Sequence, residues 1–395
     1  MKKILMIGAG YLQSFVIQKA KEMGYKVLAV DKNVDAVGFQ YADGHKAINI
    51  VDKKACFEYA QQEQIDGVLT AATDYGVLTT AYIAEKMNLP GISYKTARLV
   101  KNKYQVRKCL YENHVDDTQQ VYEISSEADA DLVREKLVYP VMVKPCDGSG
   151  SRGASRVDDP KMFWRACQKA IEASIIRKAE VEPFISGTEY GVESLVDHNE
   201  VHVLAVMKKW MTKPPYYAEL GHAVPSGLAY TVEKKVCECA KQAIQVLGIN
   251  SGSVNMDVLV TEEGKVHIID IGARMGGNMI GPCVVPYGTG IDYMENMIKI
   301  AANDSTDWTV KPHGAVATKL LAFQGGVVKK MPNFQKMMDQ YKVDIYHHLQ
   351  VNDVVREYHT NLDGCGYIIA KHDDSIEAEK IAAKVLQQIE EELFE

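Results

Sequence analysis

The most constraining feature of the sequence is a pair of predicted strands, 254–260 and 265–271, joined by a turn and followed by a glycine-rich loop at 272–278. Each strand is mostly apolar yet carries an aspartate, Asp257 in the first and Asp270 in the second. Side chains alternate between the two faces of a strand, so an acid can point to one side while its apolar neighbours pack on the other. The pattern predicts a hairpin that carries one carboxylate on each strand.

The two aspartates allow two interpretations. A buried carboxylate is costly unless it is paired or holds a metal. Two carboxylates aimed at one point, with Arg274 just past the second strand, suit a site for Mg²⁺ and a nucleotide. Alternatively, the hairpin lies at the edge of a sheet and its acids face solvent. The hairpin alone does not decide between the two, so the rest of the chain has to.

Composition restricts the class of protein. The 395 residues are enough for more than one domain, and 47% hydrophobic with 25% charged residues is ordinary for a globular enzyme. The net charge of −7 argues against non-specific binding of nucleic acid. Apolar runs are strand-length, the N-terminus resembles a first strand more than a signal peptide, and the eight cysteines are scattered. We therefore expect a cytoplasmic protein with no membrane and no nucleic-acid partner.

The first hundred residues alternate between strand and helix patterns. Predicted strands are 4–7, 27–30, 47–50 and 68–70, and predicted helices lie near 12–23, 53–63 and 75–88. Such alternation predicts a doubly wound parallel sheet. Gly8 and Gly10 follow the first strand and Asp31 ends the second, which is half of a dinucleotide fingerprint. The third glycine is missing, so a tight turn is favoured over an NAD-dependent oxidoreductase.

A lysine and a glycine-rich loop follow in the next segment. Lys144 lies in a predicted strand at 140–145, and Asp147–Gly153 holds three glycines and two serines. Such a loop can wrap phosphate oxygens, although it lacks the ending of a P-loop and an ordinary surface loop is the alternative.

Two further segments carry candidate residues. Acids alternate with apolar residues over 180–193, and we interpret Glu180 and Glu193 as solvent-facing acids of an edge strand. Residues 210–228 are expected to be an irregular loop rich in aromatics and proline, which favours a functional role. In that loop His222 is either a substrate contact or a solvent-exposed histidine.

In this order, the features resemble the ATP-grasp superfamily of carboxylate–amine ligases, in particular its carbamoyl-phosphate-synthetase-like and L-amino acid ligase-like branches. The resemblance covers nearly the whole chain. It implies a mixed α/β and α+β fold: an N-terminal doubly wound parallel sheet (the preATP-grasp domain, 1–100), an ATP-grasp domain (101–305) with a lid at about 115–182, and a small α+β C-terminal domain (306–395).

The resemblance also implies roles for individual residues. ATP phosphates would be contacted by Lys103, Lys144 and the lid residues Ser149, Gly150 and Ser151. The adenine edge would meet Glu182, Pro183 and Phe184, and the ribose Glu189. The metal carboxylates would be Asp257 and Asp270, and the implied catalytic residues are Arg274 and Lys144. Candidates for substrate contact are Glu219, His222, Arg274, Gly276 and Asn278.

The expected activity is that of an ATP-dependent ligase forming a C–N bond. A small carboxylate, such as an amino acid, would be activated as an acyl phosphate and coupled to an amine, with ATP converted to ADP and phosphate. The expected cofactors are ATP and Mg²⁺, with Mn²⁺ as an alternative ion, and we expect a homodimer. The alternatives are a catalytically reduced nucleotide-binding regulatory protein of the same fold, or an ATP-grasp carboxylase that uses bicarbonate.

One departure from the family pattern affects the metal site. The family has an asparagine two residues after the second metal carboxylate, where this chain has Gly272. The family also usually has glutamates at the metal positions, where this chain has aspartates. We therefore hypothesise that Asn255 or Asn278 supplies the missing ligand. Arg274 is present, which argues against an inactive protein.

Overall fold

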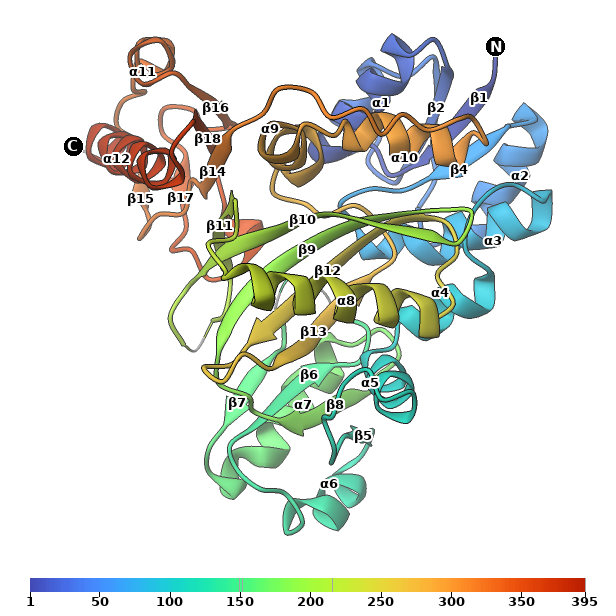
Figure 1. Ribbon diagram of the computed structural model, residues 1–395, viewed down its shortest axis with the longest axis vertical. Coiled ribbons are helices and arrows are strands. Elements are labelled where there is room, and N and C mark those ends of the chain that lie inside the picture. The colour runs from blue at the N-terminus through green and yellow to red at the C-terminus, as the bar shows by residue number, and fades with distance from the viewer. Residues whose placement is uncertain (149, 151, 215, 395) are drawn as a thin grey trace.

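Four sheets organise the described residues, which are 1–148, 150, 152–214 and 216–394 of the computed structural model. A parallel N-terminal sheet, a lid sheet and a large central sheet form the main body, and a two-stranded ribbon lies near the C-terminus (Figure 1). The mixed α/β and α+β class predicted from the sequence is confirmed. Among the described residues, no helix has the length and apolar character needed to cross a membrane.

The N-terminal sheet has the order β3-β2-β1-β4, and all its strands are parallel. Its strands are β1 (Lys3–Ile7), β2 (Lys26–Asp31), β3 (Gly44–Ala47) and β4 (Gly67–Leu69), and its helices are α1 (Tyr11–Glu22), α2 (Lys53–Glu63) and α3 (Val77–Met87). The third strand was predicted too late, at 47–50. The apolar signal there comes from Ile48 and Ile50, which pack against the core just beyond the strand.

The lid sheet is antiparallel, with the order β5-β8-β6-β7. It contains β5 (Tyr122–Ile124), β6 (Val141–Pro145), β7 (Ser155–Val157) and β8 (Ala179–Pro183), with α6 (Glu127–Arg134) and α7 (Phe163–Ala173). The buried residues of α7, including Phe163 and Ala170, pack with Val143 and Val181 of the sheet. Helices α4 (Tyr94–Val100) and α5 (Lys103–Glu112) connect the N-terminal sheet to the lid.

The central sheet has eight antiparallel strands in the order β13-β12-β9-β10-β11-β14-β18-β16. They are β9 (Thr188–Asp197), β10 (Glu200–Met211), β11 (Glu219–Val224), β12 (Gly252–Val260), β13 (Val266–Gly272), β14 (Ala315–Leu320), β16 (Val343–His347) and β18 (Gly366–His372). The predicted hairpin is confirmed as β12 and β13. The expectation of an irregular loop over 210–228 is wrong in part, because β10 extends into it and β11 pairs with β10 inside it.

Helix α8 (Tyr230–Val246) covers one face of this sheet (Figure 1). Its buried residues Val236 and Ala240 lie in one core with Met256 and Val258 of β12. Because side chains alternate, Asn255 and Asp257 point to the opposite face of β12.

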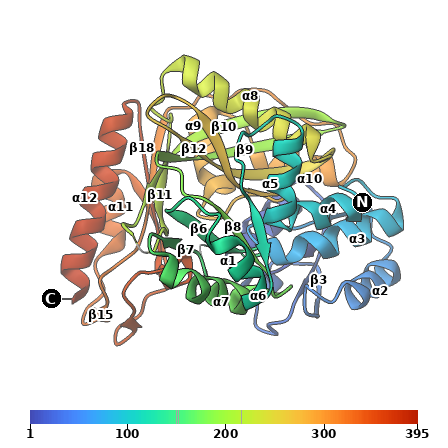
Figure 2. The same cartoon turned by 90° about the horizontal axis from the view of Figure 1, so that it is seen from below.

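The C-terminal part continues the central sheet through β14, β18 and β16. It also contains a π-helical turn η4 (Ile280–Val284), α9 (Val285–Thr289), α10 (Tyr293–Ala301), β15 (Gly326–Val327), α11 (Phe334–Tyr341), β17 (Val354–Val355) and α12 (Ser375–Phe394). Figure 2 shows α12 and the N-terminal sheet at opposite ends of the molecule. The domain boundaries near 100 and 305 stay predictions.

Candidate functional site

The hairpin places the two predicted metal carboxylates opposite each other. Asp257 of β12 and Asp270 of β13 are cross-strand partners. Directly opposed residues on antiparallel strands lie within reach of one another's side chains. Their side chains are 22% and 39% exposed, so neither acid is an ordinary surface residue and neither is sealed from a ligand.

Each of these carboxylates is paired with a lysine. Asp270 forms an ion pair with Lys103 at the start of α5. Asp257 Oδ1 lies 2.7 Å from Nζ of Lys209 on β10. Burial lowers the pKa of Lys103, but the charge of Asp270 outweighs it, so the pKa is raised. The lysine expected at the phosphates and the acid expected at the metal are thus neighbours.

Lys209 is a site residue that the sequence analysis missed. Its side chain is fully buried, and its Nζ lies 2.8 Å from Glu189 Oε1 and 2.9 Å from Glu219 Oε1, in addition to its contact with Asp257. A single ammonium therefore faces three carboxylates. Despite burial, these carboxylates raise the pKa of Lys209 well above its usual value. Lys209 lies on β10, just before the 210–228 segment that was expected to be a loop, and was therefore not among the candidates.

This cluster has an excess of negative charge. Burial, and after it the nearby charges of Glu189 and Glu219, raise the pKa of Asp257 to about 7 against the opposing effect of Lys209. Burial also acts on Glu219, but Lys209 lowers the pKa of that carboxyl to about 2 overall. Carboxylate oxygens in excess of local cations are the donor set that Mg²⁺ uses. The residues present therefore fit a divalent cation.

The predicted adenine side is built from the lid. Lys144 on β6 pairs with Glu182 on β8, and Arg107 Nη2 lies 2.8 Å from Glu182 Oε2. Burial raises the pKa of Glu182, but Arg107 and then Lys144 lower it overall. The Phe184 amide donates to Pro140 O at 3.0 Å, so this amide is already bonded within the protein. Any backbone pairing with adenine would use other groups of the 182–184 segment.

Glu180 and Glu193 contradict the expectation of solvent-facing acids. Glu180 is 2% exposed, and Glu193 is 0% exposed because β9 lies inside the sheet, not at its edge. Burial raises the pKa of Glu193 to about 8, although Tyr293 and Asn255 both donate hydrogen bonds to it. The prediction of extended strands in this region is confirmed, but the prediction that these two glutamates face solvent is wrong.

The glycine loop is anchored at its base. The Asp147 carboxylate accepts a hydrogen bond from the Ser174 hydroxyl at 2.7 Å and others from the amides of Ile175 and Ile176. Gly150 has a φ of +63°, a conformation that favours glycine. Ser149 and Ser151, predicted to contact phosphates, lie outside the described residues.

Arg274 lies between the hairpin and the segment that follows β4 of the N-terminal sheet. Its Nε and Nη2 each lie 3.1 Å from one carboxylate oxygen of Asp74, and its Nη1 donates to Asn255 Oδ1 at 2.9 Å. Burial raises the pKa of Asp74, but the charge of Arg274 outweighs it and lowers the pKa to about 2. The Asn255 oxygen is therefore taken by Arg274. The Asn278 amide nitrogen donates to Glu219, which leaves its amide oxygen as the donor that a metal would use, so Asn278 as the missing ligand stays a prediction.

Three of the five candidate substrate residues, Glu219, His222 and Asn278, lie together. Besides Lys209, Glu219 accepts hydrogen bonds from Asn278 and from Asn361 Nδ2, the latter at 3.3 Å. His222 is 1% exposed, so the solvent interpretation is wrong, and burial lowers its pKa to about 4. Its Nδ1 has no hydrogen-bond partner among the described residues. The Gly276 amide donates to Glu193 Oε1 at 3.1 Å and so lies deeper than the Glu219 cluster.

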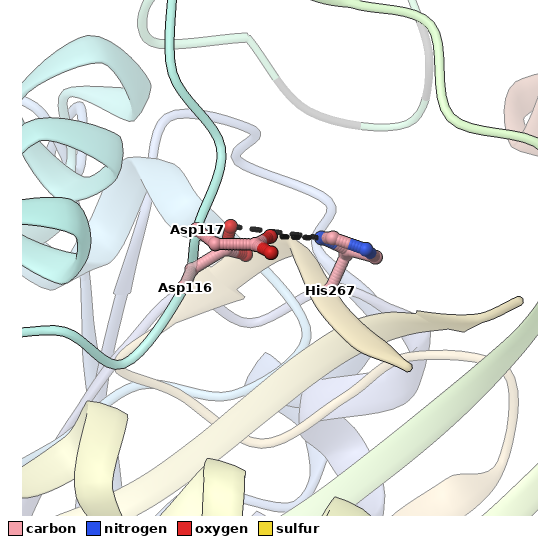
Figure 3. A group of neighbouring side chains, drawn as sticks. All are labelled: Asp116, Asp117 and His267. Carbon is pink, nitrogen blue, oxygen red and sulfur yellow. Dashed lines mark ion pairs between the residues drawn. The ribbon is translucent and has the colours of Figure 1, made fainter. Parts of the chain in front are cut away.

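A second polar cluster lies outside this site. Asp116, Asp117 and His267 offer three ligand atoms within 4.8 Å of one another (Figure 3). The Asp116 carboxylate accepts hydrogen bonds from Arg107 Nη1, from the amide and hydroxyl of Thr118, and from the amide of Ile268. Both of its oxygens are thus occupied by two donors each. The cluster connects the start of the lid to β13 through hydrogen bonds. Because these bonds occupy both Asp116 oxygens, few lone pairs remain for a metal.

Comparisons with known proteins place part of the chain in a family. Residues 137–282 match the model of the ATP-grasp domain. A D-alanine–D-alanine ligase from Cupriavidus pinatubonensis is 26% identical over 243 residues, which is 58% of this chain and 72% of that protein.

Two solved structures share the fold over almost the full length. An L-amino acid ligase from Bacillus licheniformis has a TM-score of 0.86 at 24% identity, covering 98% of both chains. An N5-carboxyaminoimidazole synthetase from Staphylococcus aureus complexed with ADP has a TM-score of 0.75 at 17% identity, covering 98% of this chain and 97% of that one. Residues 137–282 therefore match the ATP-grasp domain, and the chain as a whole shares its fold with these two solved structures.

Proposed function

We propose that the chain is an ATP-dependent ligase that activates a small carboxylic acid as an acyl phosphate and couples it to an amine. The D-alanine–D-alanine ligase and the L-amino acid ligase among its relatives support this reaction class. We further propose ATP with Mg²⁺ as the cofactors, and an amino acid as the carboxylate. A homodimer and a cytoplasmic location stay predictions.

One observation carries the proposal. On the hairpin, Asp257 and Asp270 are each paired with a lysine, Lys209 and Lys103. A bound metal and a triphosphate would separate these pairs, because the cation takes the carboxylates and the phosphate oxygens take the ammonium groups. The hairpin therefore brings together the carboxylates that would bind a metal and the ammonium groups that would bind phosphate.

The reaction would draw on these residues as follows. Asp257 and Asp270 would hold Mg²⁺, which when bound neutralises phosphate charge during transfer. Lys103 and Lys144 would bind phosphate oxygens and align the γ-phosphoryl group with the incoming carboxylate, since positioning and charge dominate this chemistry.

Arg274 would act on the other side of the transferred group. Its guanidinium lies near the hairpin but is directed toward Asp74 and Asn255. A spare N–H of Nη2 is available to an oxyanion as the amine attacks the acyl phosphate. Despite burial, Lys209 lowers the pKa of Glu219 to about 2, and this half-buried carboxylate accepts a hydrogen bond from Asn278, so it suits the recognition of a substrate ammonium group.

The test is a screen for ATP consumption over pairs of amino acids, with mass spectrometry of the products. The expected result is ADP and phosphate together with a product whose mass is the sum of two substrates less one water. Asp270→Asn should abolish ADP release, whereas Asp35→Asn, at an exposed position that is not among the candidate site residues, should not.

Two other outcomes would redirect the assignment. Stoichiometric ATP binding without turnover by any pair would favour a nucleotide-binding regulatory protein, for which Gly272 is the motivation. ADP release that depends on bicarbonate alone would favour a carboxylase. Binding of NAD in preference to ATP would contradict the proposal entirely.

A further inference from the structure

The space beside Gly272 is occupied by other side chains. A Cβ built at Gly272 would lie 3.0 Å from Asp74 Oδ1 and 3.4 Å from Cζ of Arg274. The first contact is closer than the usual separation of non-bonded heavy atoms. The ion pair of Asp74 with Arg274 therefore fills the space that a side chain at 272 would need.

Backbone contacts hold Asp74 in this place. Asp74 begins the 3-10 turn η2 (Asp74–Gly76) just after β4, and the preceding residues pair with the arginine loop. Ala71 forms a parallel bridge with Met275, and the Ala72 amide donates to Met275 O at 3.0 Å. Ala72 adopts a φ of +54°, which is uncommon for a residue other than glycine. The two loops are thus joined in a fixed register.

Side-chain contacts hold Arg274 on its other edge. Asn255 Oδ1 accepts from Nη1, while Asn255 Nδ2 donates to Glu193 Oε1 at 2.7 Å. Glu193 is itself fixed by the Tyr293 hydroxyl at 2.5 Å. The guanidinium plane is therefore set by Asp74 on one edge and by the Asn255–Glu193 pair on the other.

We propose that Asp74 is a positioning residue for Arg274 and that Gly272 is its structural counterpart, leaving the room that the carboxylate of Asp74 occupies. The inference rests on the proposed role of Arg274 in the ligase reaction. It makes the N-terminal sheet a contributor to the active site. A bidentate carboxylate fixes both the direction and the plane of a guanidinium, which a single hydrogen bond does not.

The first test is Asp74→Asn, which keeps the shape and removes the charge. Displacing a reacting group by about 1 Å can reduce a rate about 100-fold, so we expect kcat for ADP release to fall about 10- to 100-fold. The Kd for MgADP should change much less than kcat, because the hydrogen bonds of Asp74 go to Arg274 while Lys103 is paired with Asp270. Asp35→Asn, in the exposed turn that follows β2, is the matched control.

An unchanged kcat in Asp74→Asn would overturn the inference. An increase in kcat/KM would overturn it as well, because Asp74 would then be competing with the substrate for Arg274.

The second test measures the coupling between the two positions. Gly272→Ala is expected to lower both kcat and the thermal unfolding midpoint, because its Cβ meets the Asp74 carboxylate. In an Asp74→Ala background, the same change should have much less effect on the midpoint. Purely additive effects would contradict the pairing of the two residues.

The two tests separate this inference from the proposed function. If the unmodified protein releases no ADP with any substrate pair, the ligase assignment fails, and the coupling in the unfolding midpoint still decides whether Asp74 and Gly272 form a pair. If ADP is released and Asp74→Asn retains full kcat, the ligase assignment stands and the positioning role is wrong.

Discussion

The two sides of the hairpin carry opposite charge excess. On the β10 side, Glu189, Glu219 and Asp257 surround the single ammonium of Lys209. On the side of the N-terminal sheet the balance is reversed. There Lys101, Lys103 and Arg274 lie near the two carboxylates of Asp74 and Asp270.

This difference in charge predicts how a ligand would be oriented in the site. A charge that is buried without a partner is unfavourable, so each side is complementary to a ligand group of the opposite sign. The acidic side suits a divalent cation and a substrate ammonium group. The basic side suits phosphate and carboxylate oxygens. A metal–nucleotide complex beside an amino acid carries both kinds of group.

The largest effect is expected from removing the lysine of the acidic side. Lys209→Ala would leave three carboxylates without a cation, and because their side chains are 21–22% exposed, the cost should lie at or below the lower end of the roughly 3–5 kcal/mol typical of breaking a buried ion pair. We expect a loss of this size in the free energy of unfolding, measured by urea denaturation, with partial recovery on addition of Mg²⁺. Lys208→Ala is the matched control, since Lys208 pairs with Glu379 elsewhere. Unchanged stability in Lys209→Ala would mean that Lys209 does not offset a repulsion among the three carboxylates.

The next effect concerns the metal alone. Asp257→Asn should weaken Mn²⁺ binding about 100-fold, which corresponds to about 2.7 kcal/mol, because a neutral amide replaces a carboxylate ligand. Calorimetric titration in the presence of ADP measures it. Asp74→Asn, on the basic side, should leave Mn²⁺ affinity almost unchanged, and equal losses in the two variants would remove the distinction between the sides.

A pH effect of up to about tenfold per unit should follow from the raised pKa of Asp257. A metal competes with the proton, so its affinity should rise with pH up to about 7 and level off above it. Glu219→Gln removes a neighbouring negative charge, which lowers the pKa of Asp257 and should move the midpoint to lower pH. A midpoint that does not move would show that Glu219 does not influence Asp257.

The smallest effect is expected at the rim. The Tyr216 ring stacks on His359 with the centroids 3.9 Å apart, linking the 210–222 segment to the C-terminal part. Tyr216→Ala should cost about 1 kcal/mol of stability through the lost stack and change the substrate KM by at most about fivefold, without altering kcat. If Tyr216→Ala, Glu219→Ala and His222→Ala all leave activity and substrate preference unchanged, the segment does not determine specificity.

The local features of the site were accessible from the sequence. Asp257 and Asp270 on opposed strands follow from alternation and from the turn at Gly264, and their order with Lys144 and Arg274 indicated the family. The structure and the comparisons confirm the hairpin and the ATP-grasp domain.

The long-range contacts were not accessible. Lys209 pairs with Asp257 because β10 and β12 lie on either side of β9 in the sheet. A single sequence does not reveal this strand order. Asp74 meets Arg274 across 200 positions of the chain. Glu193 appeared to be a solvent-facing acid because alternation gives the period of a strand but not its neighbours.

The continuity of the central sheet has a practical consequence for dissecting the chain. Strand β14 pairs with β11, the strand that carries Glu219, so the last ninety or so residues complete the wall of the site. A truncation near residue 305 would strip β11 of its partner and expose an unpaired strand edge, which promotes aggregation. The lid sheet shares no strand pairing with the central sheet among the described residues. Segment exchange between relatives should therefore succeed more readily at the lid than at the C-terminal end.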